Sequence, residues 1–138
     1  MDIDTRKLLV ADVMTIDPVV VDVDASLEDA AHLLHANRIT GLPVVDGAGS
    51  LVGVISQTDL LAVMDSPIGR LIRTKPSGLR VGELMSSPAI TVSLTEDLGE
   101  AARLMLGSHV HRLVAIDDDG HPVGVLAAID YVTLYAEA

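Results

Sequence analysis

The alternation of apolar and polar positions in the first half of the chain predicts a small mixed unit. Apolar residues in 27–34 recur at helical spacing directly after Ser26, a residue type that suits a helix N-cap. Two continuous apolar runs follow, 41–45 and 51–55, and the Gly- and Asp-rich turn between them predicts a β-hairpin. Residues 57–64 return to a helical composition. With an extended run before the first helix, the predicted order is β-α-β-β-α.

The second half of the chain repeats this pattern with an offset of 71 residues. The register holds from Val10 and Val81 to Asp59 and Asp130, which is too regular for chance. We therefore predict an α/β (α+β) protein of two β-α-β-β-α repeats, packed around a pseudo-twofold axis because neither half alone can bury its sheet. The expected boundaries are a lead-in at 1–9, repeat one at 10–64, a connector at 65–80 and repeat two at 81–138.

The stretch GVISQTDL combines the end of a strand with the start of a helix. Its Ser56 and Asp59 lie three residues apart, which is the spacing of a capping box. The second copy, GVLAAID, keeps Asp130 but has Ala127 in place of the serine. An aspartate that persists without its capping partner needs a second explanation, although the helix dipole also favours an acidic residue in a first turn.

Composition narrows the class of protein. The chain has 138 residues, of which 49% are hydrophobic, with no Cys and a net charge of −11. This charge argues against a nucleic-acid or anionic-membrane surface. No apolar run reaches the roughly 18 residues of a spanning helix, and the N-terminus has no signal-peptide h-region. We therefore expect a soluble, cytoplasmic protein with no nucleic-acid or membrane partner.

Positive charge gathers in the connector, where Arg70, Arg73, Lys75 and Arg80 supply four of the nine basic residues. This segment, in which 68–73 could form one helical turn, is either a solvated connection or a counter-charge to an anionic ligand or partner. Aromatic residues are nearly absent, so a planar ligand would have to be enclosed by aliphatic side chains.

The repeat resembles the CBS domain, named after cystathionine β-synthase, present as a tandem pair (a Bateman module). The similarity is carried by the lead-ins VMTIDP and LMSSP, by NRITGLPVVD and HVHRLVAID, and by GVISQTDL and GVLAAIDY. It covers nearly the whole chain. The resemblance implies a regulatory module that binds adenosine-containing ligands in clefts between the repeats and commonly dimerises into a disc.

The resemblance implies a first cleft in which an aspartate binds ribose hydroxyls and a His-Arg pair from the other repeat reaches phosphate. Free N–H groups at a helix start and an Arg guanidinium both suit an anion. The residues that match are Ser56, Thr58, Asp59, Ser87, Thr91, Val110, His111 and Arg112.

The implied second cleft centres on Asp130, but it departs from the phosphate-binding pattern. Ala127 and Ile129 replace the Ser and Thr, and Thr40-Gly41 replaces the His-Arg pair. We predict that this cleft is empty, or takes a ligand without phosphates such as adenosine or S-adenosylmethionine. Its other residues are Asp17, Val20, Ile39, Thr40 and Gly41.

Each of these residues also has a structural explanation. Ser56 and Asp59 could merely cap a helix, and Arg112 could extend from a strand into solvent. Two histidine pairs, His32 with His35 and His109 with His111 on one strand face, lack a clear third ligand, so we expect no metal.

The leading hypothesis is a stand-alone regulatory module that binds AMP, ADP or ATP in the first cleft and signals, as a homodimer, to a separate partner protein. No segment outside the repeats is long enough for an output domain. The alternatives are a structural dimerisation module with vestigial clefts and a sensor of S-adenosylmethionine. An enzyme is not expected, because the sequence has no Cys, G-x-S-x-G, P-loop or Rossmann fingerprint, and no cofactor is required.

Overall fold

A computed structural model describes residues 7–64 and 78–137. The basic residues Arg70, Arg73 and Lys75, and the helical turn predicted at 68–73, lie outside the described residues. The helices and strands are α1 (Val10–Val13), β1 (Thr15–Ile16), β2 (Val21–Asp22), α2 (Leu27–Asn37), β3 (Gly41–Val45), β4 (Leu51–Ser56), α3 (Gln57–Met64), α5 (Val81–Leu84), β5 (Thr91–Ser93), α6 (Leu98–Ser108), β6 (Arg112–Ile116), β7 (Pro122–Ala127) and α7 (Ala128–Ala136).

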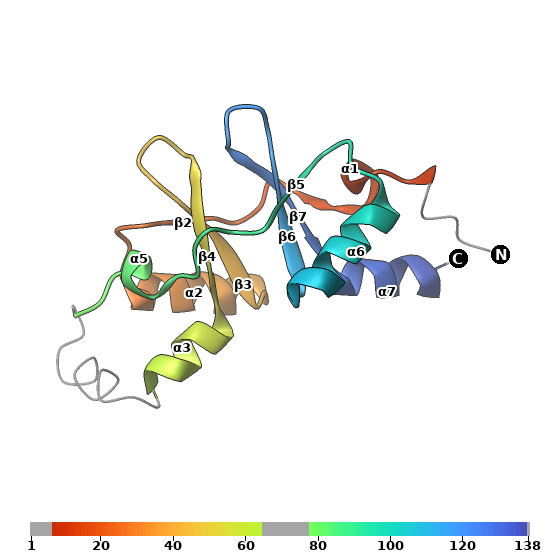
Figure 1. Ribbon diagram of the computed structural model, residues 1–138. Coiled ribbons are helices and arrows are strands. Elements are labelled where there is room, and N and C mark those ends of the chain that lie inside the picture. The colour runs from red at the N-terminus through yellow and green to blue at the C-terminus, as the bar shows by residue number, and fades with distance from the viewer. Residues whose placement is uncertain (1–6, 65–77, 138) are drawn as a thin grey trace. The chain divides into compact units, whose positions relative to one another are not determined.

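The β-α-β-β-α order is confirmed in both copies, but the compact units do not follow the copies from end to end. Unit 1 consists of Met1–Pro18 together with Ile90–Ala138, and unit 2 consists of Val19–Ala89. Helix α1, at the N-terminal end of the chain, accordingly lies with the strands of repeat two, whereas α5 lies with those of repeat one (Figure 1). The two repeats have therefore exchanged their lead-ins.

Unit 2 contains a three-stranded sheet in the order β2-β3-β4. Strands β2 and β3 run parallel, and β3 and β4 form the predicted antiparallel hairpin. Side chains alternate between the two faces of a strand, and one face packs its buried residues against α2. The core of this unit comprises Val21, Leu27, Ala30, Leu34, Leu42, Val44, Ile55, Val63 and Val81.

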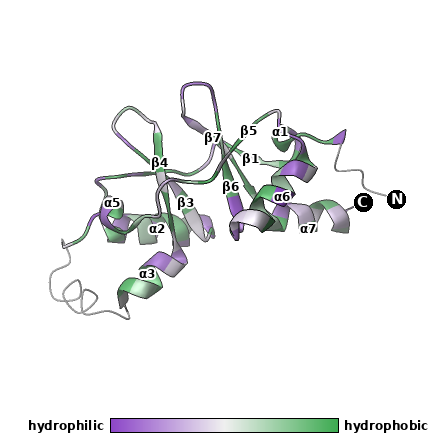
Figure 2. Ribbon diagram, in the orientation of Figure 1, coloured by the Kyte–Doolittle hydropathy of each residue, from purple (hydrophilic) through white to green (hydrophobic). Residues whose placement is uncertain are grey.

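Unit 1 contains a four-stranded sheet in the order β1-β7-β6-β5. Its hairpin and parallel pair match those of unit 2, and the lead-in adds β1 at the edge, antiparallel to β7. The turn between β6 and β7 is hydrophilic, as its run of aspartates requires, while the strands carry the apolar residues (Figure 2). The core comprises Val10, Val92, Leu98, Ala101, Met105, Leu113, Ala115 and Leu126.

The exchanged lead-ins pack against the central strands at two buried glycines, Gly53 and Gly124. A Cβ atom at Gly53 would lie 2.7 Å from both the Met85 sulfur and the Ser86 carbonyl oxygen, and a Cβ at Gly124 would collide with the Met14 side chain. Ser86 and Val54 also exchange both backbone hydrogen bonds, at 2.9 and 3.0 Å. Only a residue without a side chain lets the lead-in approach these central strands so closely.

The long helices begin at side-chain N-caps and end in left-handed residues. Ser26 Oγ accepts the Asp29 N–H at 3.1 Å, and Asp97 Oδ1 accepts the Gly99 N–H at 2.7 Å. Both helices end in a left-handed residue, Arg38 with φ 55° and His109 with φ 56°. The prediction that His109 and His111 share a strand face is therefore wrong, because His109 caps α6 and β6 begins only at Arg112.

Candidate ligand-binding site

In repeat one, the end of β4 and the start of α3 are locked together by a complete capping box. Asp59 Oδ2 accepts the Ser56 N–H at 2.8 Å and the Ser56 hydroxyl at 3.1 Å. The same hydroxyl oxygen accepts the Asp59 N–H at 3.3 Å. Thr58 is exposed on the same first turn. The strand end therefore presents a carboxylate and a hydroxyl beside the positive end of the helix dipole.

In repeat two, Asp130 keeps half of this arrangement. Its Oδ2 accepts the Ala127 N–H at 2.7 Å, although Ala127 offers no side-chain partner in return. Asp12 holds the Leu9 N–H in the same way at the start of α1, at 2.9 Å. An aspartate at the third helical position thus satisfies an N-terminal backbone group without a capping serine. This is a structural reason for Asp130 to persist, and its ligand role stays a prediction.

The two lead-in residues of the predicted clefts lie away from these helix starts. The Ser87 hydroxyl donates to the Val52 carbonyl oxygen at 2.9 Å. Val52 precedes Ser56 on β4 by four residues, which is about 13 Å along a strand. Asp17 has a left-handed backbone, φ 51°, and follows Ile16, whose partner is Gly124 on β7. Ser87 and Asp17 therefore face the opposite ends of the central strands from Asp59 and Asp130.

The His-Arg pair of repeat two lies at the start of β6. Arg112 pairs with Ala127 across the hairpin, and the His111 carbonyl oxygen accepts the N–H of Ala128 at 2.8 Å. Arg112 is half-buried, and this burial lowers the pKa of its guanidinium from the ordinary value. An Arg cation remains charged at any physiological pH. It thus lies beside the start of α7 as a partly desolvated positive charge.

The other predicted residues of unit 1 lie on or beside the same sheet. Thr91 on β5 pairs with Val114, which lies two residues beyond Arg112 on β6 and so on the same sheet face. Val110 is half-buried against the core of this unit.

Repeat one has the same backbone arrangement without the positive charge. The Thr40 carbonyl oxygen accepts the Gln57 N–H at 2.9 Å, as His111 does for Ala128, and Gly41 pairs with Ser56 as Arg112 pairs with Ala127. The sequence match of Thr40-Gly41 to His111-Arg112 is thus a structural equivalence. Ile39 packs on the core of unit 2, and Val20 is half-buried just before β2.

The predicted site residues divide between the two units. Unit 2 holds Ser56, Thr58, Asp59, Ser87, Val20, Ile39, Thr40 and Gly41, whereas unit 1 holds Asp17, Asp130, Thr91, Val110, His111 and Arg112. In unit 2, Asp59 and the Thr40 carbonyl oxygen both lie at the start of α3. In unit 1, Asp130 and the His111 carbonyl oxygen both lie at the start of α7. How the two sets combine into two clefts stays a prediction.

Sequence reasoning missed an apolar hollow on the helical side of unit 2. It has a volume of about 410 Å³ and lies between α2 and α3. Only the helical periodicity of both segments hinted at it, and periodicity does not show how far two helices stand apart. The residues that line it are Ala31, Leu34, His35, Ile39, Gln57, Leu60 and Leu61.

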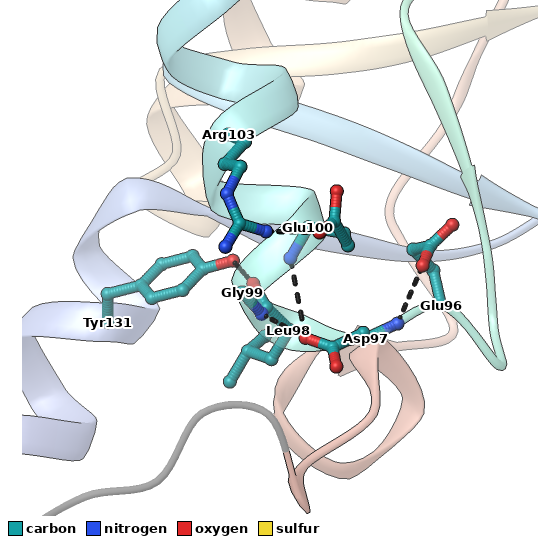
Figure 3. Close-up of polar contacts among 7 residues, drawn as sticks. All are labelled: Glu96, Asp97, Leu98, Gly99, Glu100, Arg103 and Tyr131. Carbon is teal, nitrogen blue, oxygen red and sulfur yellow. Dashed lines mark hydrogen bonds and ion pairs between the residues drawn. The ribbon is translucent and has the colours of Figure 1, made fainter.

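Sequence reasoning also passed over Tyr131. Its hydroxyl donates to the Leu98 carbonyl oxygen at 2.7 Å, so that α7 is tied to the first turn of α6 (Figure 3). Burial raises the pKa of the Tyr131 phenol to about 12, and the negative charges of Asp130 and Asp97 add to this effect. The repeat offered one signal for this residue. The offset of 71 pairs Tyr131 with Leu60, so that repeat two has a hydroxyl-bearing side chain where repeat one has an aliphatic one.

The raised pKa of Tyr131 gives a stability that depends on alkaline pH. The folded state holds the phenol proton more tightly than the unfolded chain, so this contribution is complete below pH 10.0 and is lost as the pH rises to about 12. Urea unfolding across this range should show the stability advantage of the wild type over Tyr131→Phe, about 1 kcal/mol near neutral pH, shrinking steadily. A difference that stayed constant with pH would contradict the assignment.

Neither a metal cluster nor a membrane span is found in the described ranges. Within residues 7–64 and 78–137, no three His, Asp or Glu side chains gather closely enough to hold a metal ion. Over the same residues, no helix has both the length and the apolar character to cross a bilayer.

Comparison with known proteins identifies the class. Residues 10–66 and 81–137 each match the CBS domain. The chain therefore belongs to the CBS-domain family and carries two CBS repeats in tandem. The chloroplastic CBS domain-containing protein CBSX2 of Arabidopsis thaliana is 36% identical over 129 residues, which cover 78% of this chain and 54% of that relative. This chain thus spans about half the length of CBSX2.

Two solved structures of similar CBS pairs contain adenosine compounds. CBSX2 in complex with AMP is 37% identical, with a TM-score of 0.79 over 94% of this chain and 96% of that one. The CBS pair of protein MJ0100, in complex with 5′-methylthioadenosine and S-adenosyl-L-methionine, is 25% identical, with a TM-score of 0.83 over 94% and 97%. Inosine-5′-monophosphate dehydrogenase of Methanocaldococcus jannaschii is 28% identical, but the match covers only 22% of that enzyme.

Proposed function

We propose that this protein is a non-enzymatic regulatory module that binds an adenosine-containing ligand through Asp59, and through Asp130 at a second, weaker site. The observation that carries the proposal is the position of these carboxylates. Each holds a backbone N–H with Oδ2, and within the described residues no hydrogen bond uses its Oδ1. An ionised carboxylate is an acceptor only, and adjacent sugar hydroxyls are donors that such an oxygen can accept.

The two sites are proposed to differ in their preference for phosphate. The site at Asp59 would combine the hydroxyls of Ser56 and Thr58 with the charge of Arg112, which favours AMP, ADP or ATP. The site at Asp130 has Ala127 and the uncharged Thr40-Gly41, which favours adenosine or S-adenosylmethionine. The AMP complex of CBSX2 and the S-adenosylmethionine complex of the MJ0100 pair support both ligand classes.

Isothermal titration calorimetry tests this proposal directly. We expect AMP to bind wild-type protein, and Arg112→Ala to weaken AMP by about tenfold to 100-fold through loss of a charge-assisted contact. Adenosine serves as the matched ligand, since it lacks the phosphate and should be much less sensitive to Arg112→Ala. Absence of binding for adenosine, AMP, ATP and S-adenosylmethionine alike would overturn the proposal in favour of a structural module with vestigial clefts.

The homodimer expected from the sequence is supported by an apolar stripe on α7. Ile129, Val132 and Tyr135 are 63%, 60% and 59% exposed, and their spacing of three places them on one helix face. The proposed occupant is a second copy of this chain, because two chains of net charge −11 approach each other with least repulsion at an uncharged stripe.

Val132→Asp is expected to weaken this dimer by roughly 100-fold or more, because burying an unpaired carboxylate costs several kcal/mol. Analytical ultracentrifugation measures the change. Leu106→Asp is the matched control, since Leu106 is 76% exposed on α6, outside the stripe, and also changes from an apolar residue to Asp. If wild type and both variants sediment alike, the α7 interface is refuted.

The regulated target is proposed to be a separate protein, which would respond to ligand only if it distinguishes the bound from the free state. A cytoplasmic location also stays a prediction, and the relative CBSX2 is chloroplastic.

A further inference from the structure

We infer that Tyr131 is a positioning residue for the Asp130 site: its hydroxyl bond to the Leu98 carbonyl fixes the first turn of α7 on α6 and thereby sets where the Asp130 carboxylate meets a ligand. This inference rests on the proposed function, because it presumes that Asp130 contacts a bound adenosine compound. It concerns a residue that lies next to the ligand-binding aspartate but points away from it, toward α6.

The first observation is the contact itself. The Tyr131 hydroxyl lies 2.7 Å from the carbonyl oxygen of Leu98, a residue 33 positions earlier in the chain. Leu98 is fully buried and is the first residue of α6, and the Tyr131 ring packs on the same core. The bond therefore joins the first turn of α7 to the first turn of α6 at a buried position (Figure 3).

The second observation is that the two repeats hold their aspartates by different means. In repeat one, Asp59 is held by both the N–H and the hydroxyl of Ser56, and the residue after it, Leu60, has no polar group in its side chain. In repeat two, Ala127 supplies only its N–H, and the next residue is Tyr131. Repeat two thus lacks the serine hydroxyl that precedes the aspartate in repeat one. It has instead a tyrosine hydroxyl bond directly after the aspartate.

The third observation is the electrostatic proximity of the phenol to the site. The charges of Asp130, on its own helix, and of Asp97, at the N-cap of α6, both act on Tyr131. Glu96, Glu100 and Arg103 belong to the same end of α6, where Glu100 and Arg103 form an ion pair with each other. A ligand that engages Asp130 therefore changes the electrostatic field at the Tyr131 phenol.

The test isolates each site with one background variant. Asp59→Asn leaves the Asp130 site, and Asp130→Asn leaves the Asp59 site. Adenosine affinity is then measured by calorimetry with and without Tyr131→Phe. We expect Tyr131→Phe to weaken adenosine by about threefold to tenfold in the Asp59→Asn background, which is the effect of one lost hydrogen bond, and to leave it unchanged in the Asp130→Asn background. A merely structural role would not separate the two backgrounds.

A spectroscopic measurement completes the test. Tyr131 and Tyr135 are the two tyrosines of the chain, so Tyr135→Phe leaves a single phenol for ¹³C labelling at Cζ. Adenosine should shift this Tyr131 resonance, and Asp130→Asn should abolish the shift. Equal effects of Tyr131→Phe in both backgrounds, or no effect in either, would overturn the inference alone. An Asp59→Asn protein that binds no adenosine would also overturn it, whereas wild-type protein that binds no adenosine compound would overturn the proposed function itself.

Discussion

Asp59→Asn is expected to weaken AMP binding by about 100-fold while leaving the fold nearly as stable as the wild type. Asparagine keeps one carbonyl oxygen, which can still accept the Ser56 N–H that Asp59 holds at 2.8 Å. The NH₂ of its amide, in place of Oδ1, cannot accept a hydrogen bond from a ligand hydroxyl, and each hydrogen bond to a charged group contributes about 1.5–3 kcal/mol. Calorimetry with AMP, beside thermal unfolding of the same samples, separates the two effects.

Two control variants make this experiment decisive. Asp59→Ala removes both the ligand contact and the helix cap, so it should lose AMP and also about 1 kcal/mol of stability. Asp12→Asn alters an aspartate that caps α1 in the same way, on the Leu9 N–H, and should leave AMP affinity unchanged. If Asp59→Asn bound AMP as tightly as the wild type, capping alone would explain this aspartate.

Gly53→Ala is expected to lower the free energy of unfolding by about 1–3 kcal/mol, the usual effect of overpacking a tight interior. Its new methyl group would lie 2.7 Å from the Ser86 carbonyl oxygen, which is backbone and is fixed by the paired hydrogen bonds with Val54. The lead-in would have to move off β4 to relieve the contact. Urea unfolding, read as the shift of the transition midpoint, measures the loss.

Gly124→Ala and Gly107→Ala serve as comparison variants for Gly53→Ala. At Gly124 the three atoms nearest to the added methyl group all belong to the flexible Met14 side chain, so the loss should be smaller, and Met14→Ala should restore part of it. Gly107 lies in α6 with no atom within 4 Å of its added Cβ, so alanine should stabilise the helix by up to about 1 kcal/mol. Equal behaviour of Gly53→Ala and Gly107→Ala would show that the lead-in is not closely seated on β4.

The hairpins and the long helices were predictable because their signals are local. The apolar periodicity of α2 and α6, the Asp-Gly turns and the N-caps at Ser26 and Asp97 all act within a few residues. The exchange of lead-ins was not predictable in this way. Helices α1 and α5 have four residues each, too few for a period, and their partners are chosen by tertiary packing on a distant strand.

The candidate site shows the same division. Repeat comparison identified Asp59 and Asp130 and the equivalence of Thr40 with His111, because register carries over between copies. It could not show that Asp130 caps the Ala127 N–H by itself, since a backbone partner leaves no mark in the sequence. Nor could it show that Tyr131 reaches Leu98, a contact fixed by the angle at which α7 packs on α6.

The pairing of β1 with β7 also constrains the order in which the chain can fold. Thr15 pairs with Val125, at the opposite end of the sequence, whereas every strand of unit 2 lies within Val19–Ala89. During synthesis, unit 2 can close as soon as residue 89 has left the ribosome, but the N-terminal lead-in must wait for the last strand. Unit 1 therefore has the higher contact order and the larger loop to close. Until β7 emerges, β1 in the N-terminal lead-in has no strand to pair with, and its exposed backbone can pair with another chain.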